Sequence, residues 1–256
     1  MGMAIEKVIE KKLDLSRINV SSYISLLLVE RVRRGEERVI EEMGREISLK
    51  LMNMSDEPRV MNLLSKAEKY CSVLEEEALK IYGGVVAIDA EVSTRLLVHA
   101  RNPYIPLNIG ISWHPYFNLP YIPASSIKGA VRSYAEMREK KEIGGFKLDY
   151  LFGRMGEEGM IIFFDSFPIK CSKRLLEADV ITPHYKERSN KIKEIDVKPT
   201  PIIFPVVATG VVFRIIVGLR KELKRATSDV LQLLKETLTE GLGAKTLVGY
   251  GKFRLK

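Results

Sequence analysis

The sequence predicts an α+β protein in which helices come first and a β-sheet follows. Two observations carry this prediction. Apolar residues recur at three- and four-residue spacing as far as residue 82, which is the period of an amphipathic helix. After Gly83 and Gly84 the pattern changes to β-branched runs with partial alternation, interrupted by two helical segments.

Residues 1–84 are expected to form an N-terminal helical extension. Leu, Ile, Val and Met lie among charged residues at helical spacing in segments 23–34 and 60–82, and Pro58 marks a break before the second segment. An apolar helix face has two uses here, because it serves either to dock a partner subunit or to cap the sheet. The sequence leaves both open.

Residues 85–256 are expected to form the second domain. Strands are predicted at 85–98, 159–164, 209–219 and the C-terminus, with helices at 126–141 and 229–239. This order resembles a ferredoxin-like (RRM-like) βαββαβ unit with additions. Such a sheet carries helices on one face and leaves the other face open, as in RNA-recognition modules.

The composition argues against a membrane or secreted protein. Hydrophobic residues make up 46% of the chain, but no apolar run approaches the roughly 18 residues of a membrane span. No signal-peptide pattern is present, so we expect a cytoplasmic location. Cys71 and Cys171 stand without a CxxC pair or a histidine cluster, so no disulfide framework, metal site or cofactor is predicted.

The net charge of +8 is unevenly distributed along the chain. Residues 1–82 hold 14 Lys and Arg against 15 Asp and Glu, whereas residues 83–256 hold 27 against 18, which gives net charges of −1 and +9. A basic surplus confined to one part is the pattern expected of contact with a polyanion. On charge alone, a solvated basic surface explains it equally well.

Residues 92–135 form a stretch of 44 residues without Asp or Glu. It lacks the charges that would repel a phosphate backbone, and it combines cations with rings on which bases of single-stranded RNA stack. We favour RNA contact over the alternative, a buried β-rich segment. The cations, histidines and aromatic residues of the stretch are Arg95, His99, Arg101, Tyr104, Trp113, His114, Tyr116, Phe117, Tyr121, Lys128, Arg132 and Tyr134.

The segment YIPASSIKGAVRSYAE, residues 121–136, reads as the start of a helix. Pro123 favours an extended approach, and Ser125 or Ser126 is expected to be the N-cap. Lys128 and Gly129 then fall in the first turn, where a cation is unfavourable unless an anion lies beside it. A phosphate held by the first-turn amides and Lys128 would explain both residues. The alternative is that Gly129 packs against a strand.

The C-terminal segment GLGAKTLVGYGKF, residues 241–253, contains the residue types of a phosphate-binding loop in the wrong order. In an NTPase the loop leads from a strand into a helix, and a Gly precedes the Lys. Here Ala244 precedes Lys245, and the loop leads from a helix into a final strand. We reject the NTPase interpretation and keep a glycine-rich loop bearing Lys245 and Thr246, whose backbone can approach an anion closely.

These two motifs together resemble the RAMP superfamily of CRISPR-associated proteins, in which an IPGSSLKG-like segment and a terminal glycine-rich loop are paired. FFDSFP (163–168) and DVITPHY (179–185), followed by PTPIIF (199–204), make the resemblance closest to the sixth subunit of the Cmr complex, the type III-B RNA-guided effector. The resemblance covers about residues 105–256. Ala124 stands where the family usually has Gly, and residues 1–84 carry no matching motif.

The resemblance implies a RAMP fold and a structural, non-catalytic subunit in antiviral defence. It would contact the guide RNA towards its 3′ end and neighbouring RAMP subunits, and would meet target RNA only through the guide. We expect the two motifs to converge into one anion-binding pocket. The implied contacts to the guide backbone are Ser125, Ser126, Lys128, Arg132, Gly243, Lys245, Thr246, Gly249, Tyr250 and Gly251.

Some RAMP proteins are nucleases, so catalysis is the alternative function. A metal-dependent member of the superfamily would place an Asp in the loop after the first strand, and here that loop lies in the acid-free stretch. A metal-independent ribonuclease would instead use His114 or His184 as general acid or base, with Tyr185, Lys186 or Lys245 assisting. A lone histidine among aromatic residues is more often structural, so we predict no enzymatic activity.

Overall fold

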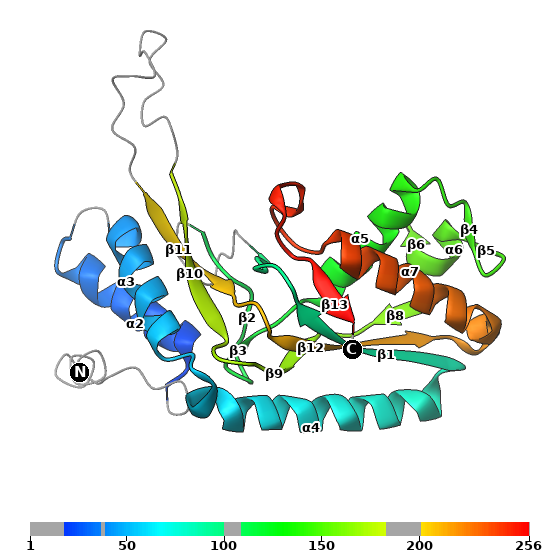
Figure 1. Ribbon diagram of the computed structural model, residues 1–256, viewed down its shortest axis with the longest axis horizontal. Helices are drawn as coiled ribbons and strands as arrows, with labels where there is room; N and C mark the ends of the chain where they lie inside the picture. The colour runs from blue at the N-terminus through cyan, green and yellow to red at the C-terminus, as the bar shows by residue number, and fades with distance from the viewer. Residues whose placement is uncertain (1–17, 37–38, 100–108, 183–200, 256) are drawn as a thin grey trace, which may run out of the picture.

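An antiparallel sheet of five strands forms the centre of the molecule (Figure 1). The computed structural model describes residues 18–36, 39–99, 109–182 and 201–255. The strand order is β13-β1-β12-β8, and β9 also pairs with β12. These strands are β1 (Gly84–Val92), β8 (Ile161–Phe163), β9 (Phe167–Lys170), β12 (Val212–Leu219) and β13 (Phe253–Leu255).

The longest pairing joins β1 to β12, in a register that runs from Gly84 opposite Leu219 to Glu91 opposite Val212. Seven of the eight β12 residues are buried, and Arg214 is the exception. Arg214 donates to both carboxylate oxygens of its cross-strand neighbour Asp89, at 2.7 and 2.8 Å. A strand that is apolar on both sides needs cover on both faces of its sheet.

Helices cover both faces of the sheet. The helices α5 (Ala124–Met137) and α7 (Thr227–Glu240) lie on one face, at the positions predicted from helical spacing. The long helix α4 (Glu57–Ile81) packs on the other face against β1, β9 and β12, through residues such as Val60, Ala67 and Cys71 (Figure 1). The open second face predicted from the sequence is therefore wrong, because α4 occupies it.

The helix α3 (Val39–Asn53) packs against a separate two-stranded hairpin, and α2 (Val20–Arg33) packs against α3. The hairpin consists of β10 (Leu176–Ile181) and β11 (Ile202–Val207), and α3 contacts both strands (Figure 1). Buried residues of α2, α3, α4 and the central sheet belong to one hydrophobic cluster. Described residues of both predicted domains thus contribute to a shared core.

Short elements complete the fold. The strand predicted over 85–98 ends at Val92, and beyond it Leu96 makes only an isolated bridge to Val207. None of the helices in the described part of the chain is long and apolar enough to cross a membrane. The short elements are β2 (Trp113–His114), β3 (Leu119–Pro120), β4 (Glu142–Ile143), β5 (Phe146–Lys147), α6 (Leu148–Phe152), β6 (Gly153–Arg154), β7 (Glu157–Glu158), η2 (Lys221–Ala226) and η3 (Thr246–Val248).

Candidate nucleic-acid interface

The first turn of α5 is capped by an aspartate from a distant segment. The helix begins at Ala124, with Pro123 as its N-cap, and the Ala124 amide donates to Oδ1 of Asp165 at 2.7 Å. The Ser126 amide donates to the Pro123 carbonyl at 2.9 Å. Ser125 and Ser126 therefore lie inside the helix, and the predicted serine cap is wrong.

Asp165 reaches this position because the edge of the sheet is interrupted. The strands β8 and β9 pair with different parts of β12, and Phe164, Asp165 and Ser166 form the break between them. Ser166 forms a bridge with Ile122, and its hydroxyl donates to the Arg214 carbonyl at 2.7 Å. The FFDSFP motif thus has a structural role, because it places a carboxylate at the helix N-terminus, where a negative charge is favourable.

A shallow cleft of about 550 Å³ lies beside Lys128 and Arg132. Gly129 is exposed on the same turn, and a Cβ added there would meet nothing within 4 Å. The alternative that Gly129 packs against a strand is therefore wrong, and the bare backbone faces open space. The lining residues are Lys128, Arg132, Phe152, Gly153, Arg154, Met155, Glu157, Glu158, Gly159, Ile162 and Arg220.

Most cations of this cleft are held by carboxylates. Arg132 pairs with Glu136 at 2.8 Å and with Asp149 at 3.2 Å, and it also donates to the Gly153 carbonyl at 2.8 Å. Arg154 pairs with Glu157 and Arg220 pairs with Glu158. Among the described residues no ion pair involves Lys128. Lys128 is consequently the cleft cation best able to meet an external anion.

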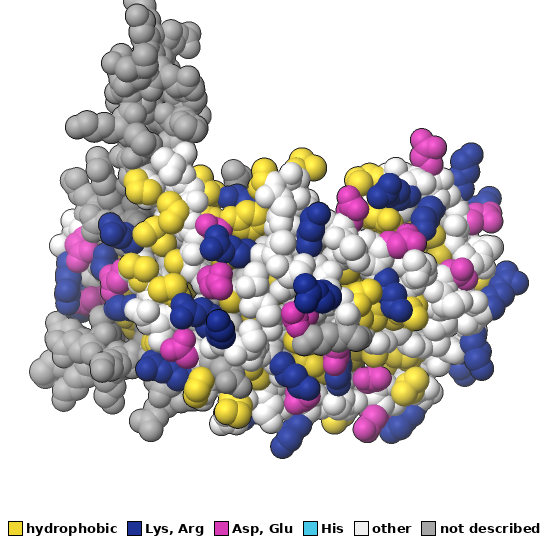
Figure 2. Space-filling model, viewed as in Figure 1, with side chains coloured by type: hydrophobic (Ala, Val, Ile, Leu, Met, Phe, Trp, Pro, Cys, Tyr) yellow, Lys and Arg dark blue, Asp and Glu magenta, His cyan; other side chains and the backbone are white. Residues whose placement is uncertain are grey.

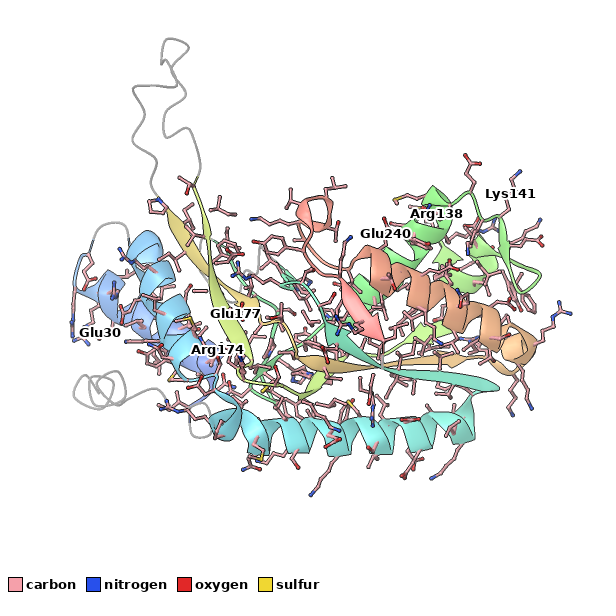
Figure 3. All side chains as sticks on the ribbon, viewed as in Figure 1. Glu30, Arg138, Lys141, Arg174, Glu177 and Glu240 are labelled. Atoms are coloured by element: carbon pink, nitrogen blue, oxygen red, sulfur yellow. The ribbon has the colours of Figure 1, made fainter. Side chains whose placement is uncertain are left out.

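The opposite end of α5 is tied to α7. Figure 3 shows Arg138 of α5 and Glu240 of α7 pointing toward one another, and their charged atoms lie 3.6 Å apart. Lys140 and Glu236 form a second pair at 2.9 Å. These contacts join the C-terminal ends of the two helices.

The terminal loop, residues 241–251, packs on the segment that follows β1. The Ala244 amide donates to the Leu97 carbonyl at 2.7 Å, and the Gly251 amide donates to the Arg95 carbonyl at 2.9 Å. Gly251 has a φ of +72°, and a Cβ there would lie 1.9 Å from the Leu242 carbonyl oxygen. Only glycine fits this position, which explains one of the glycines of the motif.

Lys245 and Tyr250 face the β10–β11 hairpin. The Lys245 ammonium lies 5.0 Å from the ring centroid of Phe204 and 5.3 Å from that of Tyr250. The Tyr250 hydroxyl donates to Asp179 on β10. Thr246 opens η3, and the next two side chains, Leu247 and Val248, are 102% and 72% exposed. The tip of the loop is therefore free for a contact, while its base is held.

The two motifs do not share the cleft beside Lys128. None of the terminal-loop residues, all of which are described, lines this cleft. The pocket predicted to contain both motifs is therefore not this cleft. In the view of Figure 2, Lys and Arg side chains are interspersed with Asp and Glu, so this face has no continuous basic stripe.

Two other features of the acid-free stretch have structural partners. Arg95 pairs with Glu177 at 3.2 Å and with Asp179 at 3.1 Å, so its charge is balanced inside the protein. His114 packs against Phe117, Tyr121 and Phe167, with ring centroids 5.1 to 5.2 Å away. Its Nδ1 accepts from the Phe117 amide at 3.3 Å, and burial lowers its pKa below the usual 6.5.

Several sequence predictions lie outside the described residues. They concern His184, Tyr185 and Lys186 of the alternative ribonuclease site, and Arg101 and Tyr104 of the acid-free stretch. Within the ranges that the structure describes, no group of three or more His, Cys, Asp or Glu side chains is placed to hold a metal ion.

The comparison with protein families identifies the chain. A family model for the RAMP superfamily matches residues 90–254. The chain belongs to the RAMP superfamily. The matched region begins near the end of β1 and ends inside β13, so it includes β8, β9 and β12, the α5 cleft and the terminal loop.

Two curated proteins are similar in sequence. The chain is 36% identical over 193 residues to the CRISPR system CMR subunit Cmr6 of Saccharolobus solfataricus, over 74% of this chain and 64% of the relative. It is 35% identical over 112 residues to the Cmr6 subunit of Pyrococcus furiosus, over 40% of this chain and 32% of that one. The chain thus spans less than two thirds of the length of either relative.

One solved structure matches nearly the whole RAMP chain. It is a chain of the cryo-EM structure of the Type III-B Cmr-beta complex bound to cognate target RNA. The match covers 98% of this chain and 95% of that chain, with 28% sequence identity and a TM-score of 0.77. The N-terminal helices, which carry no motif recognised in the sequence, are therefore included in the structural similarity.

Proposed function

We propose that this protein is a non-catalytic, RNA-binding structural subunit of a type III-B CRISPR effector complex that acts in the cytoplasm in antiviral defence. It would contact the guide RNA towards its 3′ end and pack against neighbouring RAMP subunits. One observation carries the proposal above the others: the fold matches a chain of a type III-B complex bound to target RNA over 98% of its length. The similarity to two Cmr6 subunits supports the same role.

The geometry supports RNA contact at two places. At the α5 cleft, Lys128 lies beside the exposed backbone of Gly129, and Ser125, Ser126 and Arg132 flank it. At the terminal loop, Gly249 has open space where a side chain would lie, close to Lys245, Thr246 and Tyr250. Gly243 packs against the Leu97 carbonyl, and Gly251 sets the turn. A cation beside backbone that a phosphate can approach closely suits a polyanion. Such contacts ignore base identity, as a scaffold for any guide sequence requires.

We also assign the central sheet to the ferredoxin-like class and the chain to two domains. The strand order places the last strand beside the first, and the first beside β12, with β8 and β9 at the far edge. Helices α5 and α7 connect these strands on one face, as in a βαββαβ unit. Residues 85–256 would be this RAMP domain, and residues 1–84 an extension whose helix α4 has been recruited to its second face.

The contacts of His114 favour a structural role over catalysis. Its ring lies within an aromatic cluster, and one of its two nitrogens already accepts a hydrogen bond from the backbone. We therefore expect the purified chain to leave guide and target RNA intact, with or without a divalent metal ion. Cleavage that is lost in His114→Ala or His184→Ala would overturn the structural role.

Co-purification tests the proposal as a whole. The chain carries an affinity tag and is isolated from the native cells at low salt, after which mass spectrometry identifies proteins and sequencing identifies RNA. The proposal predicts other Cmr subunits and CRISPR guide RNA. Recovery of the chain alone, or with unrelated RNA and proteins, would contradict it.

A further inference from the structure

An ion-pair network fastens the terminal loop to the β10–β11 hairpin. The guanidinium of Arg95 bridges Glu177 and Asp179, which lie two residues apart on β10, at 3.2 and 3.1 Å. Asp179 also accepts from the Tyr250 hydroxyl and, at 2.8 Å, from the Val180 amide. Glu177 is labelled on β10 in Figure 3. Three segments distant in the sequence therefore meet at one carboxylate.

The network lies next to the loop cation. Tyr250 is the link, because its hydroxyl binds Asp179 while its ring lies beneath the Lys245 ammonium. The backbone of Arg95 accepts from the Gly251 amide, so the same residue holds the loop through both side chain and main chain. Releasing the Tyr250 hydroxyl would free the ring, and Lys245 would then keep only one of its two ring contacts, the one with Phe204.

The protonation states fit a permanent link. Burial raises the pKa of Asp179, but the hydrogen bonds from Tyr250 and the Val180 amide and the charge of Arg95 outweigh it, so the pKa lies below its usual value. Burial and the hydrogen bond to Asp179 raise the pKa of Tyr250 to about 12. At neutral pH the carboxylate is charged and the hydroxyl keeps the proton that it donates.

We propose that Asp179 and Arg95 are positioning residues, which hold Tyr250 and Lys245 of the terminal loop in the geometry that binds an RNA phosphate. The inference rests on the proposed function and deepens it, because it assigns a role to an acid beside a site for a polyanion. A carboxylate there repels RNA unless its geometric role outweighs the repulsion. The side chain of Asp179 is only 12% exposed and is paired with Arg95, which limits that repulsion.

The direction in which Asp179→Asn changes RNA affinity distinguishes a positioning role of Asp179 from simple repulsion of RNA. Asp179→Asn removes a negative charge near the loop, so without a positioning role it would tighten RNA binding. If Asp179 holds the loop, the same change weakens binding by roughly three- to tenfold, because asparagine offers Tyr250 only a neutral acceptor and offers Arg95 no opposite charge. Tyr250→Phe changes no charge and should weaken binding to a similar extent. The double variant should be no weaker than the worse single variant, because both changes act through the Asp179–Tyr250 hydrogen bond.

The experiment measures the affinity of the full chain for a fluorescein-labelled single-stranded RNA of mixed sequence. Binding is detected by fluorescence anisotropy at low salt. Glu177→Gln is the matched control, because it removes an equal charge from the same strand but leaves the Asp179–Tyr250 bond in place. It should bind as tightly as the wild type or slightly more tightly. Hydrogen exchange of the Ala244 and Gly251 amides, which the loop buries in bonds to Leu97 and Arg95, should be faster in Asp179→Asn and Tyr250→Phe than in Glu177→Gln.

The outcomes distinguish the two proposals. Wild-type affinity or tighter binding in Asp179→Asn and Tyr250→Phe, with a loss in Lys245→Ala, would overturn the positioning role alone. Unchanged exchange of the two amides in both variants would also overturn it. RNA binding that is absent in the wild type, at a concentration where its fold is intact, would overturn the proposed function and the RNA role of the network together.

Discussion

The carboxylate of Asp165 caps α5 by accepting the Ala124 amide at 2.7 Å, across 41 residues of sequence. This contact links the break in the edge of the sheet to the helix that carries Lys128. It also means that an anion from within the protein already sits at the first amide of the helix. RNA phosphate would therefore meet the side of the first turns, at Lys128 and Gly129, and not the helix end.

The cap predicts unequal effects of two substitutions at the start of α5. Asp165→Ala should lower the free energy of unfolding by about 1 kcal/mol, the usual cost of losing a side-chain cap. Ser125→Ala should change it by less than about 0.5 kcal/mol, because Ser125 is exposed inside the helix. Urea denaturation measures both. A larger loss of unfolding free energy for Ser125→Ala than for Asp165→Ala would indicate that Ser125, and not Asp165, caps the helix.

Removal of the proposed phosphate-binding cations should weaken RNA binding without regard to sequence. We expect Lys128→Ala and Lys245→Ala each to lower affinity about equally for RNAs of different sequence, and to reduce the slope of log affinity against log salt by about 1. Lys221→Ala is the control, because Lys221 is exposed in η2, outside both sites. Fluorescence anisotropy over a salt series measures the slopes. Slopes equal to that of the control in both variants would show that neither lysine contacts RNA phosphate.

Gly129 should show opposite effects on stability and on binding. It lies inside α5 with open space around it, so Gly129→Ala should raise the free energy of unfolding by about 0.5–1 kcal/mol through helix propensity. If RNA approaches the bare backbone, the larger uncharged side chain of Gly129→Gln should weaken RNA binding while the protein stays folded. Equal RNA affinity of Gly129→Gln and the wild type would show that RNA does not approach this turn.

His114 should make stability depend on pH. Its pKa in the folded state is lowered from 6.5 by burial, so the unfolded chain takes up a proton below about pH 6.5 that the folded chain resists. The contribution of neutral His114 to the free energy of unfolding is therefore fully present above about pH 6.5. It is lost as the pH falls through the pKa of His114 in the folded state. His114→Asn keeps an acceptor for the Phe117 amide but removes the titration, so it should lose less stability than the wild type between about pH 7.5 and about pH 5.5. An equal loss in both proteins, measured by urea denaturation, would assign the pH dependence elsewhere.

Local patterns were sufficient to predict most regular elements. The helical spacing in 23–34, 60–82, 126–141 and 229–239 corresponds to α2, α4, α5 and α7, and the β-branched runs correspond to β1, β8 and β12. The helix α3 and the β10–β11 hairpin were not predicted. These elements pack against one another, and such tertiary packing is not visible in the local spacing of apolar residues.

Long-range partners explain the failures at the candidate site. The serine cap was a sound local inference, but Asp165 supplies the cap from another element, which no spacing rule near residue 125 contains. Arg95 reads as a free cation in an acid-free stretch, yet its acids Glu177 and Asp179 come from β10. The charged Asp179 inside the otherwise apolar run ADVI was the available signal that β10 carries a buried polar contact.

The most direct test of RNA attachment is ultraviolet crosslinking in the purified native complex, followed by mass spectrometry of peptide–RNA adducts. Our proposal predicts adducts to guide RNA in the terminal-loop peptide containing Lys245 and Tyr250, and in the α5 peptide containing Lys128. Their yield should fall in Lys245→Ala and Lys128→Ala respectively. Guide adducts confined to other surfaces, such as the exposed side of α4, would contradict it.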